Sequence, residues 1–388
     1  MEWKEYQIQD VCRLINGRAY SNDEMLEHGK YKIVRVGNLS GGNSTWFYSD
    51  LELPADKYCH NGDLLFAWAC TFGPHIWKED NTIFHYHIWK IVEDKDVVDR
   101  RFFYYYLKFA TGGFLGALNG SVMVHITKSS MEKMIIRIPK NLEDQRRIAS
   151  ILSSLDRKIE MNNKINADLE EMAQAIFKNW FVDFEPFKDG KFVDSELGMI
   201  PEGWKVVVFD NILKVTTTKT GKEGIPEYSV TNTGIHPRDE KFTKNLSKSS
   251  AKNKLIRKGN LVFGMSREIL NWGIMKEEVG GVSSAYNVYI VDEKIVSTTY
   301  LECFIAQRMD YFADLIKPAS REGQGVDKAL LMKKIICIPP SEVLDVFLEK
   351  YNSIMHLTEI RNQENSRLSL LRDTLLPRLM SGELEVPE

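Results

Sequence analysis

The pattern of hydrophobic and polar positions changes its period twice along this chain. Up to about residue 140, short β-branched and aromatic runs are broken by Gly, Asn, Asp and Pro, which predicts strands. From Ile148 the apolar positions step by alternating four and three residues, which predicts a long helix with a heptad seam. The same change of period follows residue 339. The predicted fold class is therefore α+β, with two domains of mixed strands, each followed by a long helix.

The two predicted helices carry seams that are apolar at their ends and polar at their centres. Two such seams in one chain bury each other most simply as an antiparallel coiled coil, in which Asn162 and Asn166 face Arg361 and Glu364 and fix the register. The alternative is two separate amphipathic helices, each packed on its own domain. Pro377 is expected to end the second helix. The predicted helix-pairing and subunit-interface residues are Leu152, Leu155, Ile159, Asn162, Asn166, Leu169, Ile176, Trp180, Arg361, Glu364, Leu368 and Leu371, with Ile148, Ala173, Ile354, Leu357 and Leu375 in the same seams.

Short phrases recur about 200 residues apart and in the same order. "KMIIRIP" (133–139) returns as "KKIICIP" (333–339), and "NGDLLFA" (61–67) returns as "KGNLVFG" (258–264). "WK" at Trp3 returns at Trp204, and "VRVGNLSGG" has a looser counterpart in "YSVTNTGIH". Matching pieces in one order indicate a two-fold internal repeat. We predict one domain over 1–140, a helical spacer over 141–190, a second domain over 191–339 and a second helix over 340–388.

Within each repeat, further elements are expected at matching places. "YQIQDVCRLI" (6–15) and "VVVFDNILKV" (206–215) are strand-like, as are 81–92 and 283–291. Helices are expected over 100–118 and 298–316. The "IIxIP" phrases are expected to form the last strand of each domain.

Composition excludes several classes of protein. With 43% hydrophobic and 27% charged residues, the chain is expected to be an ordinary globular protein. It has no apolar run of about 18 residues, and its first ten residues do not resemble a secretion signal. The five cysteines form no C-x-x-C pair, which favours reduced thiols in a cytoplasm over disulfides or a zinc site.

The net charge of −3 hides a basic stretch. Residues 241–258, "KFTKNLSKSSAKNKLIRK", contain seven Lys or Arg and no acid. Such a run is often only a solvated loop, and phosphate binding is the more specific interpretation.

The usual signs of catalysis are missing from the sequence. It contains neither a P-loop nor a dinucleotide-binding glycine pattern, and the histidines and cysteines form no metal motif. His85 and His87 are expected to share one face of a strand, and a structural role is favoured over metal binding. Asp183 and Glu185 in "FVDFEPF" form a carboxylate pair with no basic partner apparent nearby, and a structural role at the helix end is favoured over acid–base chemistry. No catalytic or metal-binding residue is predicted.

Two stretches resemble a known family. "QRRIASILSSLDRKIEMNNKINADLEEMAQAIFKNWFVDFEPF" (145–187), followed by "LGMIPEGWKV" (197–206), is similar to the central region of type I restriction–modification specificity subunits. The tail "LRDTLLPRLMSGEL" (371–384) resembles the end of their second conserved region. The order of a recognition domain, a helix, a second recognition domain and a second helix also agrees. One departure is "NQENSR" (362–367), which is more polar than "NNKINA" (162–167) in the first helix.

The resemblance implies a non-catalytic, DNA-reading subunit in a prokaryotic cytoplasm. Each recognition domain reads one half of a split target in double-stranded DNA. The partners are two methyltransferase subunits, which carry S-adenosylmethionine, and translocating restriction subunits, which use ATP and Mg²⁺. No cofactor is expected on this chain. The apolar side chains of Ile176, Phe177, Trp180 and Phe181 are expected to be exposed and to need those partners.

Candidate DNA contacts are polar and cationic residues in loops between the predicted strands. The alternative for each is the ordinary polarity of a turn. Lys252 and Lys254 are expected on phosphates, and Arg267 or Gln324 on bases. The full set is Arg18, Tyr20, Asn38, Ser40, Thr71, Lys78, Lys219, Thr220, Lys222, Asn232, Thr233, Lys252, Lys254, Arg267, Asn271, Arg321 and Gln324.

Two other functions are compatible with parts of the sequence. A scaffold or adhesin with a helical stalk would have no affinity for DNA. A nuclease with Asp183 and Glu185 as metal ligands would cleave DNA by itself in a metal-dependent way.

Overall fold

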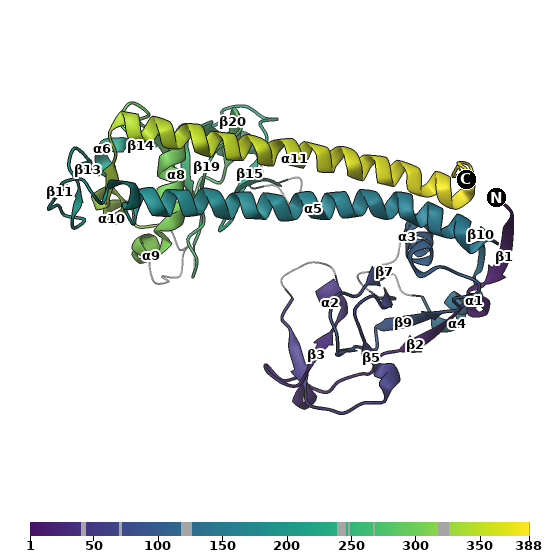
Figure 1. Ribbon diagram of the computed structural model, residues 1–388. Coiled ribbons are helices and arrows are strands. Elements are labelled where there is room, and N and C mark those ends of the chain that lie inside the picture. Colours follow the sequence, from purple (N-terminus) through teal and green to yellow (C-terminus); the bar gives the residue numbers. More distant parts are fainter. Residues whose placement is uncertain are drawn as a thin grey trace. The chain divides into compact units, whose positions relative to one another are not determined.

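The chain divides into two units, and each contains part of both long helices. Unit 1 comprises Met1–Lys164 and Arg361–Glu388, and unit 2 comprises Ile165–Ile360. The computed structural model describes residues 1–39, 44–69, 72–117 (backbone alone for 113–117), 126–238, 246, 249–266, 268–316 and 326–387. Figure 1 shows the elements in the order of the chain.

Unit 1 begins with a strand that pairs with the last strand before the helix. β1 (Trp3–Gln7) is antiparallel to β10 (Ile135–Pro139), with Trp3 opposite Pro139. A four-stranded sheet has the order β2-β9-β6-β7, and a second has the order β4-β3-β8-β5. Their strands are β2 (Cys12–Asn16), β3 (Tyr31–Val34), β4 (Phe47–Ser49), β5 (Tyr58–Cys59), β6 (Leu64–Ala67), β7 (Gly73–Ile76), β8 (Thr82–Phe84) and β9 (Ile88–Glu93).

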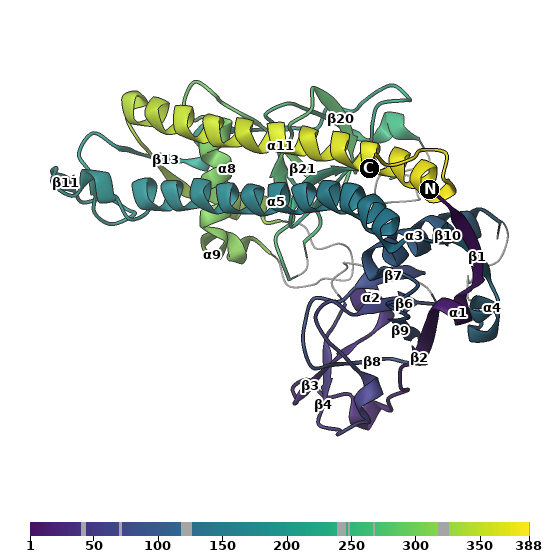
Figure 2. The same ribbon diagram turned by 45° about the vertical axis from the view of Figure 1, so that its right-hand side comes forward.

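Helices cover the first of these sheets. α3 (Arg100–Ala117) lies between the sheet and the first turns of α5 (Leu142–Phe181), as Figures 1 and 2 show. Leu64, Phe66, Phe102 and Leu152 are all buried in the core between them. The remaining helices of unit 1 are short: α1 (Ile8–Val11), α2 (Val36–Leu39), α4 (Lys128–Glu132), η1 (Asn22–Glu24) and η2 (Ala55–Lys57).

Unit 2 repeats this arrangement. β13 (Lys205–Val208) pairs with β22 (Ile335–Ile338), and a four-stranded sheet has the order β14-β21-β18-β19. Two further antiparallel pairs belong to unit 2: β15 with β16, and β17 with β20. These strands are β14 (Leu213–Thr216), β15 (Tyr228–Thr231), β16 (Gly234–Pro237), β17 (Lys254–Arg257), β18 (Leu261–Phe263), β19 (Trp272–Ile274), β20 (Val279–Val282) and β21 (Asn287–Val291).

The helices of unit 2 occupy corresponding places in the chain. α8 (Thr298–Gln307) corresponds to α3, and its Tyr300 is buried with Phe177 of α5 and Phe347 of α11 (Ser341–Ser381). The other elements are α6 (Phe209–Ile212), α9 (Met309–Phe312), α10 (Lys328–Lys333), η3 (Glu185–Phe187), η4 (Ser250–Lys252), η5 (Ala313–Leu315), β11 (Phe192–Val193) and β12 (Ile200–Pro201).

The predicted internal repeat is thereby confirmed at the level of topology. The repeated "IIxIP" phrases form β10 and β22. Each is the last strand of its repeat and pairs with the first strand of the same repeat. Gly62 and Gly259 precede β6 and β18 with φ of 89° and 82°, a left-handed conformation that favours glycine. The same residue occurs at both positions because each unit contains the same glycine turn before this strand.

The long helices run antiparallel where they meet inside each unit. In unit 1 the Asn162 amide donates to Glu364 Oε2 at 2.7 Å and to Asn365 Oδ1 at 2.9 Å, and Arg372 pairs with Asp156 at 2.7 Å. In unit 2 the rings of Phe177 and Phe347 lie 5.7 Å apart. The predicted contact between Asn162 and Glu364 is confirmed.

The predicted phase of the second seam is wrong at Leu357 and Leu371. These leucines are 43% and 47% exposed, whereas Thr358 and Arg372 lie one residue further on and are less exposed. The leucines attracted the prediction because they are apolar. The helix instead directs the side chain of Arg372 inward, where its guanidinium forms an ion pair with Asp156.

Pro377 does not end the second helix, which continues to Ser381. The ring of a helical proline disrupts one hydrogen bond and costs about 3 kcal/mol. Leu376, Leu379 and Met380 are all buried in the core of unit 1, and their burial offsets that cost.

The structure also corrects three local predictions. The strand-like runs 6–15 and 206–215 are each interrupted by one helical turn, α1 and α6. The helix expected over 298–316 breaks at Arg308, where φ is −122° and ψ is 37°. Ile176, Phe177, Trp180 and Phe181 are not an exposed face, since Phe177 and Phe181 are buried and the other two pack against the core of unit 2.

Candidate nucleic-acid interface

Predicted DNA contacts in unit 2 gather where two loops meet. The Thr220 N–H donates to the Asn253 carbonyl at 2.9 Å, and the Gly221 N–H donates to the Ala251 carbonyl at 3.1 Å. Lys219 forms an isolated bridge with Lys254. These contacts bring Lys219, Lys222, Lys252 and Lys254 together, and we call this set the lysine cluster. Its first three members are exposed.

Lys254 is the most constrained member of the lysine cluster. Its ammonium donates to the carbonyl of Tyr286 at 2.5 Å. Its pKa is lowered by burial and then by the charge of Lys328, an exposed residue in α10. Lys328 therefore adds a cation near this cluster that the sequence pattern did not indicate, because it lies over 70 residues away in the chain.

A carboxylate fixes the loop that carries Lys252. Glu223 accepts hydrogen bonds from the Ser249 and Ser250 hydroxyls and, at 3.1 Å, from the Ser250 N–H. These donors lower the pKa of Glu223 to about 2. Glu223 thus stays ionised and offsets part of the positive charge while it holds the loop in place.

Three other predicted contacts in unit 2 have structural partners. Thr220 is buried and its hydroxyl donates to the Ser250 carbonyl at 2.6 Å. The Asn271 amide donates to the Met265 carbonyl at 2.5 Å. The Thr233 hydroxyl is 2.9 Å from His236 Nε2. These bonds favour the turn-forming role for Thr220 and Asn271, while their contact with DNA stays a prediction.

In unit 1 the predicted contacts Arg18 and Tyr20 lie together, and Arg18 is already paired. Arg18 makes a bidentate ion pair with Glu24, at 2.9 and 2.6 Å, and lies 5.2 Å from the centre of the Tyr20 ring. The hydrogen bond from Arg18 lowers the pKa of Glu24 to about 2. Tyr20 is buried. Arg18 must leave Glu24 before it can bind a base edge with both nitrogens.

Next to Arg18 lies a group of aromatic and histidine side chains that the sequence did not single out as DNA contacts. The Tyr86 N–H donates to the Arg18 carbonyl at 2.9 Å, and the indole of Trp68 donates to the Tyr86 carbonyl at 2.9 Å. The ring centres of Trp68 and His87 are 4.9 Å apart, and Tyr86 is exposed. Trp68, His85, Tyr86 and His87 form what we call the aromatic–histidine cluster.

His85 and His87 do not share one face of a strand as expected. β8 ends at Phe84 and β9 begins at Ile88, so both histidines lie in the connecting turn, with ring centres 5.1 Å apart. Burial lowers the pKa of His85 to about 4, with His87 and Arg35 contributing, and burial also lowers the pKa of His87. Both rings are therefore neutral at pH 7 and can each donate and accept one hydrogen bond. The alternating aromatic run "FHYHIW" was the available signal.

The remaining predicted DNA contacts in unit 1 differ in how firmly they are held by other residues. Asn38 accepts from the Arg35 N–H at 3.0 Å and donates to the Ser44 carbonyl at 3.3 Å, so it holds a turn. Lys78 is exposed and pairs with Glu160 across the surface, an interaction weak enough to exchange for a phosphate. The predicted contacts Ser40, Thr71, Arg267, Arg321 and Gln324 lie outside the described residues.

The predicted helix residues also vary in burial. Leu152 and Asn162 are buried, and Ile176 and Trp180 are partly buried against the core of unit 2. Leu371 is exposed, so it does not pack within the helix pair, and its place in a subunit interface stays a prediction. Partial burial is shared by Leu155, Ile159, Asn166, Leu169, Arg361, Glu364 and Leu368.

The carboxylates Asp183 and Glu185 are paired with lysines. Asp183 binds Lys178, and Glu185 binds Lys188 at 2.7 Å. The basic partners that the sequence did not reveal are therefore five and three residues away. In the part of the chain that the structure describes, no three His, Cys, Asp or Glu side chains form a group able to hold a metal ion. Among the described helices, none is long and apolar enough to cross a membrane.

Comparisons with known proteins agree with this architecture. The family model of the type I restriction modification DNA specificity domain matches residues 1–171. The type I restriction enzyme MjaIX specificity subunit of Methanocaldococcus jannaschii is 30% identical over 316 residues, which cover 76% of this chain and 71% of that protein. The HindI specificity subunit of Haemophilus influenzae is 24% identical and covers 99% of this chain and 100% of its own.

A solved structure shares the fold. The type I restriction–modification S subunit of M. genitalium superimposes with a TM-score of 0.55 at 13% identity, covering 98% of this chain and 96% of that one. At this identity the similarity concerns the fold alone. Combined with the sequence relatives, it leads to one conclusion: this chain belongs to the specificity subunits of type I restriction–modification systems.

Proposed function

We propose that this chain is a non-catalytic subunit that reads a split DNA target, with one half read by each unit. The observation that carries the proposal is the repeated topology, in which the sheet β2-β9-β6-β7 of unit 1 and the sheet β14-β21-β18-β19 of unit 2 have corresponding strand orders. Unit 2 offers the lysine cluster, which suits phosphates. Unit 1 offers the aromatic–histidine cluster beside Arg18, which suits bases.

The spacing between the two halves would be set by the long helices. α5 contains 40 residues, and an α-helix of that length measures about 60 Å. One turn of B-DNA is about 34 Å long. The amide of Asn162, which binds Glu364 and Asn365, supports the idea that the register of the helices is fixed.

The partners would be two methyltransferase subunits, which carry S-adenosylmethionine, and restriction subunits, which use ATP and Mg²⁺. This chain would bind none of these cofactors itself. Exposed apolar side chains on both helices support a role in docking: Met161, Leu370 and Leu371 in unit 1, and Met172, Leu357 and Ile360 in unit 2. The expected compartment is a prokaryotic cytoplasm, where the free thiols of Cys12, Cys59, Cys303 and Cys337 would stay reduced.

The decisive experiment is to express the chain with its methyltransferase subunit and to map methylated adenines in the DNA of the host. A motif with two specified parts separated by unspecified base pairs is expected. A continuous motif would contradict a split target, and no methylation beyond the level of a strain without this chain would contradict the proposal itself.

A domain exchange tests the assignment of the halves. Residues 1–140 are replaced by the corresponding segment of a relative with a different target. One half of the methylated motif should change and the other should stay. A change in both halves would mean that the units do not read DNA independently.

A further inference from the structure

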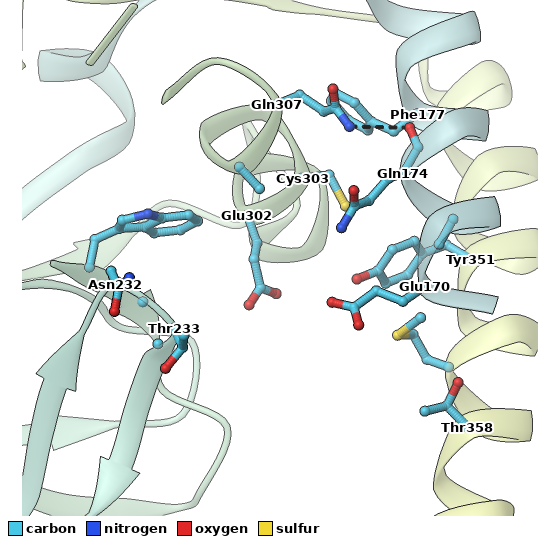
Figure 3. Close-up of a pocket in the computed structure, with 16 residues that line it drawn as sticks. Glu170, Gln174, Phe177, Asn232, Thr233, Glu302, Cys303, Gln307, Tyr351 and Thr358 are labelled. Atoms are coloured by element: carbon cyan, nitrogen blue, oxygen red, sulfur yellow. Dashed lines mark hydrogen bonds between the residues drawn. The ribbon is translucent and has the colours of Figure 1, made fainter. Parts of the chain in front are cut away.

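Unit 2 contains a cavity of about 480 Å³ beside its helices. Figure 3 shows its walls: α5, α8 and α11 on one side, and the turn between β15 and β16 with β19 on the other. Gly273 of β19 makes this closure possible, because a Cβ there would lie 2.9 Å from Ile235 Cγ1 and 3.1 Å from the Ile235 nitrogen. The turn residues Asn232 and Thr233 line this cavity.

Two carboxylates point into the same space. Glu170 extends from α5 and Glu302 from α8, with the hydroxyl of Tyr351 near both (Figure 3). Burial raises the pKa of Tyr351, and Cys303, Glu302 and Glu170 raise it further. Lys276 lies outside the lining and pairs with Glu302. The lining itself contains no Lys, Arg or His.

The rest of the wall is apolar and aromatic. Phe177 and Trp272 are buried, and Ala173 and Met355 also line the cavity. Burial raises the pKa of the Cys303 thiol to about 12, so it stays protonated and adds no charge. Trp and Met surfaces accept the methylenes of a cationic side chain, and the face of an indole also attracts the cation.

The chemistry of the lining excludes other ligands. Lys276 offsets the charge of Glu302 from outside the lining, and Glu170 remains with no Lys, Arg or His beside it in the lining, so this cavity does not suit the phosphates of the DNA backbone. No metal-binding group of three side chains occurs among the residues described, so an inorganic divalent cation is not favoured. An organic cation satisfies both the carboxylates and the apolar wall.

The corresponding place in unit 1 has the opposite charge. A cleft of about 460 Å³ lies between α3, β7 and the helices, where α8 and β19 border the cavity in unit 2. Its lining includes Lys78, Arg101, Lys108, Arg157 and Arg372, against only two carboxylates, Asp156 and Glu160. The chain thus contains its own comparison site, which should reject a cation.

We propose that the cavity of unit 2 binds an alkylammonium group, with the nitrogen between Glu170 and Glu302 and the alkyl stem against Trp272 and Met355. Free diamines and the side chain of a partner's lysine share this chemistry. The proposal does not depend on DNA reading.

The test is calorimetric titration of the full chain with 1,5-diaminopentane in the absence of DNA. Binding with a Kd on the order of 1 mM or tighter is expected, and 1-pentanol, which lacks the charge, should bind at least about tenfold more weakly. Glu302→Gln and Glu170→Gln should each weaken the diamine about five- to tenfold. Glu171→Gln, which changes an exposed neighbour outside the lining, is the matched control.

A steric variant separates the cavity from the general surface charge. Ala306→Leu fills part of the lining without altering any charge and should also reduce binding. The proposal is overturned if the diamine shows no saturable binding up to about 20 mM. It is equally overturned if 1-pentanol binds as tightly as the diamine, or if all four variants bind the diamine with the same affinity.

The source of the cation is decided with the assembled methyltransferase complex. Loss of diamine binding on assembly, restored by removing one lysine of the methyltransferase subunit, identifies a partner side chain. Unchanged binding identifies a free diamine. Because the titration uses no DNA, a failure to bind diamines leaves the methylation result untouched, and the converse also holds.

Discussion

The two units use the same elements to pack the long helices, yet the contacts differ in kind. In unit 2, Phe177 meets Phe181, Tyr300 and Phe347, with ring centres 5.0 to 5.7 Å apart. In unit 1, the two helices are also joined by the ion pair of Asp156 with Arg372 and by the amide of Asn162. The junction of unit 2 is aromatic, whereas that of unit 1 combines the buried apolar side chains of Leu152, Leu376 and Leu379 with a charged and hydrogen-bonded part.

The hollows next to these junctions differ in the same way. The cleft of unit 1 is lined mainly by cations, and the cavity of unit 2 by two carboxylates and aromatic rings. The apolar pattern that determines the strands and helices is shared, so the fold is shared. The charged positions do not determine the topology, and they have diverged. The differences in chemistry between the units therefore lie at equivalent positions of one architecture.

The largest expected effect comes from the aromatic junction. Phe177→Ala should lower the free energy of unfolding by about 3–5 kcal/mol, since the side chain is fully buried. Hydrogen exchange should accelerate mainly in unit 2. Phe102→Ala, at a fully buried phenylalanine of unit 1, is the matched variant and should act mainly on unit 1. If each variant accelerates exchange equally in both units, the units unfold as one block.

The charged junction should be weaker. Asp156 pairs with Arg372 and also accepts a hydrogen bond from the Tyr105 hydroxyl at 2.6 Å. Arg372→Met removes the first interaction and leaves the second. The pair is partly exposed, so we expect a loss of about 2 kcal/mol rather than the larger value of a fully buried pair. Urea unfolding measures it, with Arg367→Met on the exposed face of the same helix as control. Equal losses for the two variants would show that the ion pair contributes nothing.

Lowering the pH should reduce the stability of unit 1 more than that of unit 2, because of His85. The folded pKa is about 4, whereas the unfolded ring has a pKa near 6.5, so the unfolded state binds the proton first as the pH falls. Stability should drop between pH 6.5 and pH 4, by about 1 kcal/mol, because the ring is half-exposed and solvent screens it. The corresponding turn 283–286 of unit 2 has no histidine.

The measurement is hydrogen exchange of each unit at pH 7 and pH 5, corrected for the intrinsic pH dependence of exchange. Unit 1 should lose protection, and His85→Gln should abolish the loss. The same loss in unit 2, or its persistence in His85→Gln, would assign the acid sensitivity to other groups.

The smallest effect is expected on DNA binding by the lysine cluster. Lys219→Ala and Lys252→Ala should each weaken binding about threefold near 0.1 M salt and reduce the slope of log K against log salt by about 1. The loss should be equal for target and non-target DNA. Lys294→Ala, an exposed lysine of unit 2 outside the cluster, is the control. A loss restricted to the target sequence would mean that these lysines read bases.

Much of the fold was accessible from the sequence because buried strands and helices repeat a pattern. The repeat, the extent of the long helices and the contact between Asn162 and Glu364 all followed from periodicity. The phase of the second seam did not, because a pattern of apolar residues assigns Leu371 inward. Only the position of Asp156, 216 residues away, explains why Arg372 is inside.

The candidate site was harder to predict from the sequence, because it too depends on contacts between residues far apart in the chain. The lysine cluster depends on two loops that meet through backbone hydrogen bonds, and its neighbour Lys328 comes from a third element. Trp68 and Tyr86 were missed because aromatic residues in a strand-rich segment usually indicate core. Asn232 and Thr233 have the polarity of a DNA-contacting loop, yet the fold directs them to a cavity with two carboxylates.

The discontinuity of unit 1 has a consequence for the order of events on the ribosome. Unit 2 is one continuous stretch, so it can close once residue 360 has emerged. Unit 1 needs Leu376, Leu379 and Met380 in its core, and these residues follow the whole of unit 2. At about 5–20 residues per second, the first half of unit 1 waits on the order of ten seconds or more for its last helix. The unit whose synthesis begins first is therefore the one whose folding is completed last.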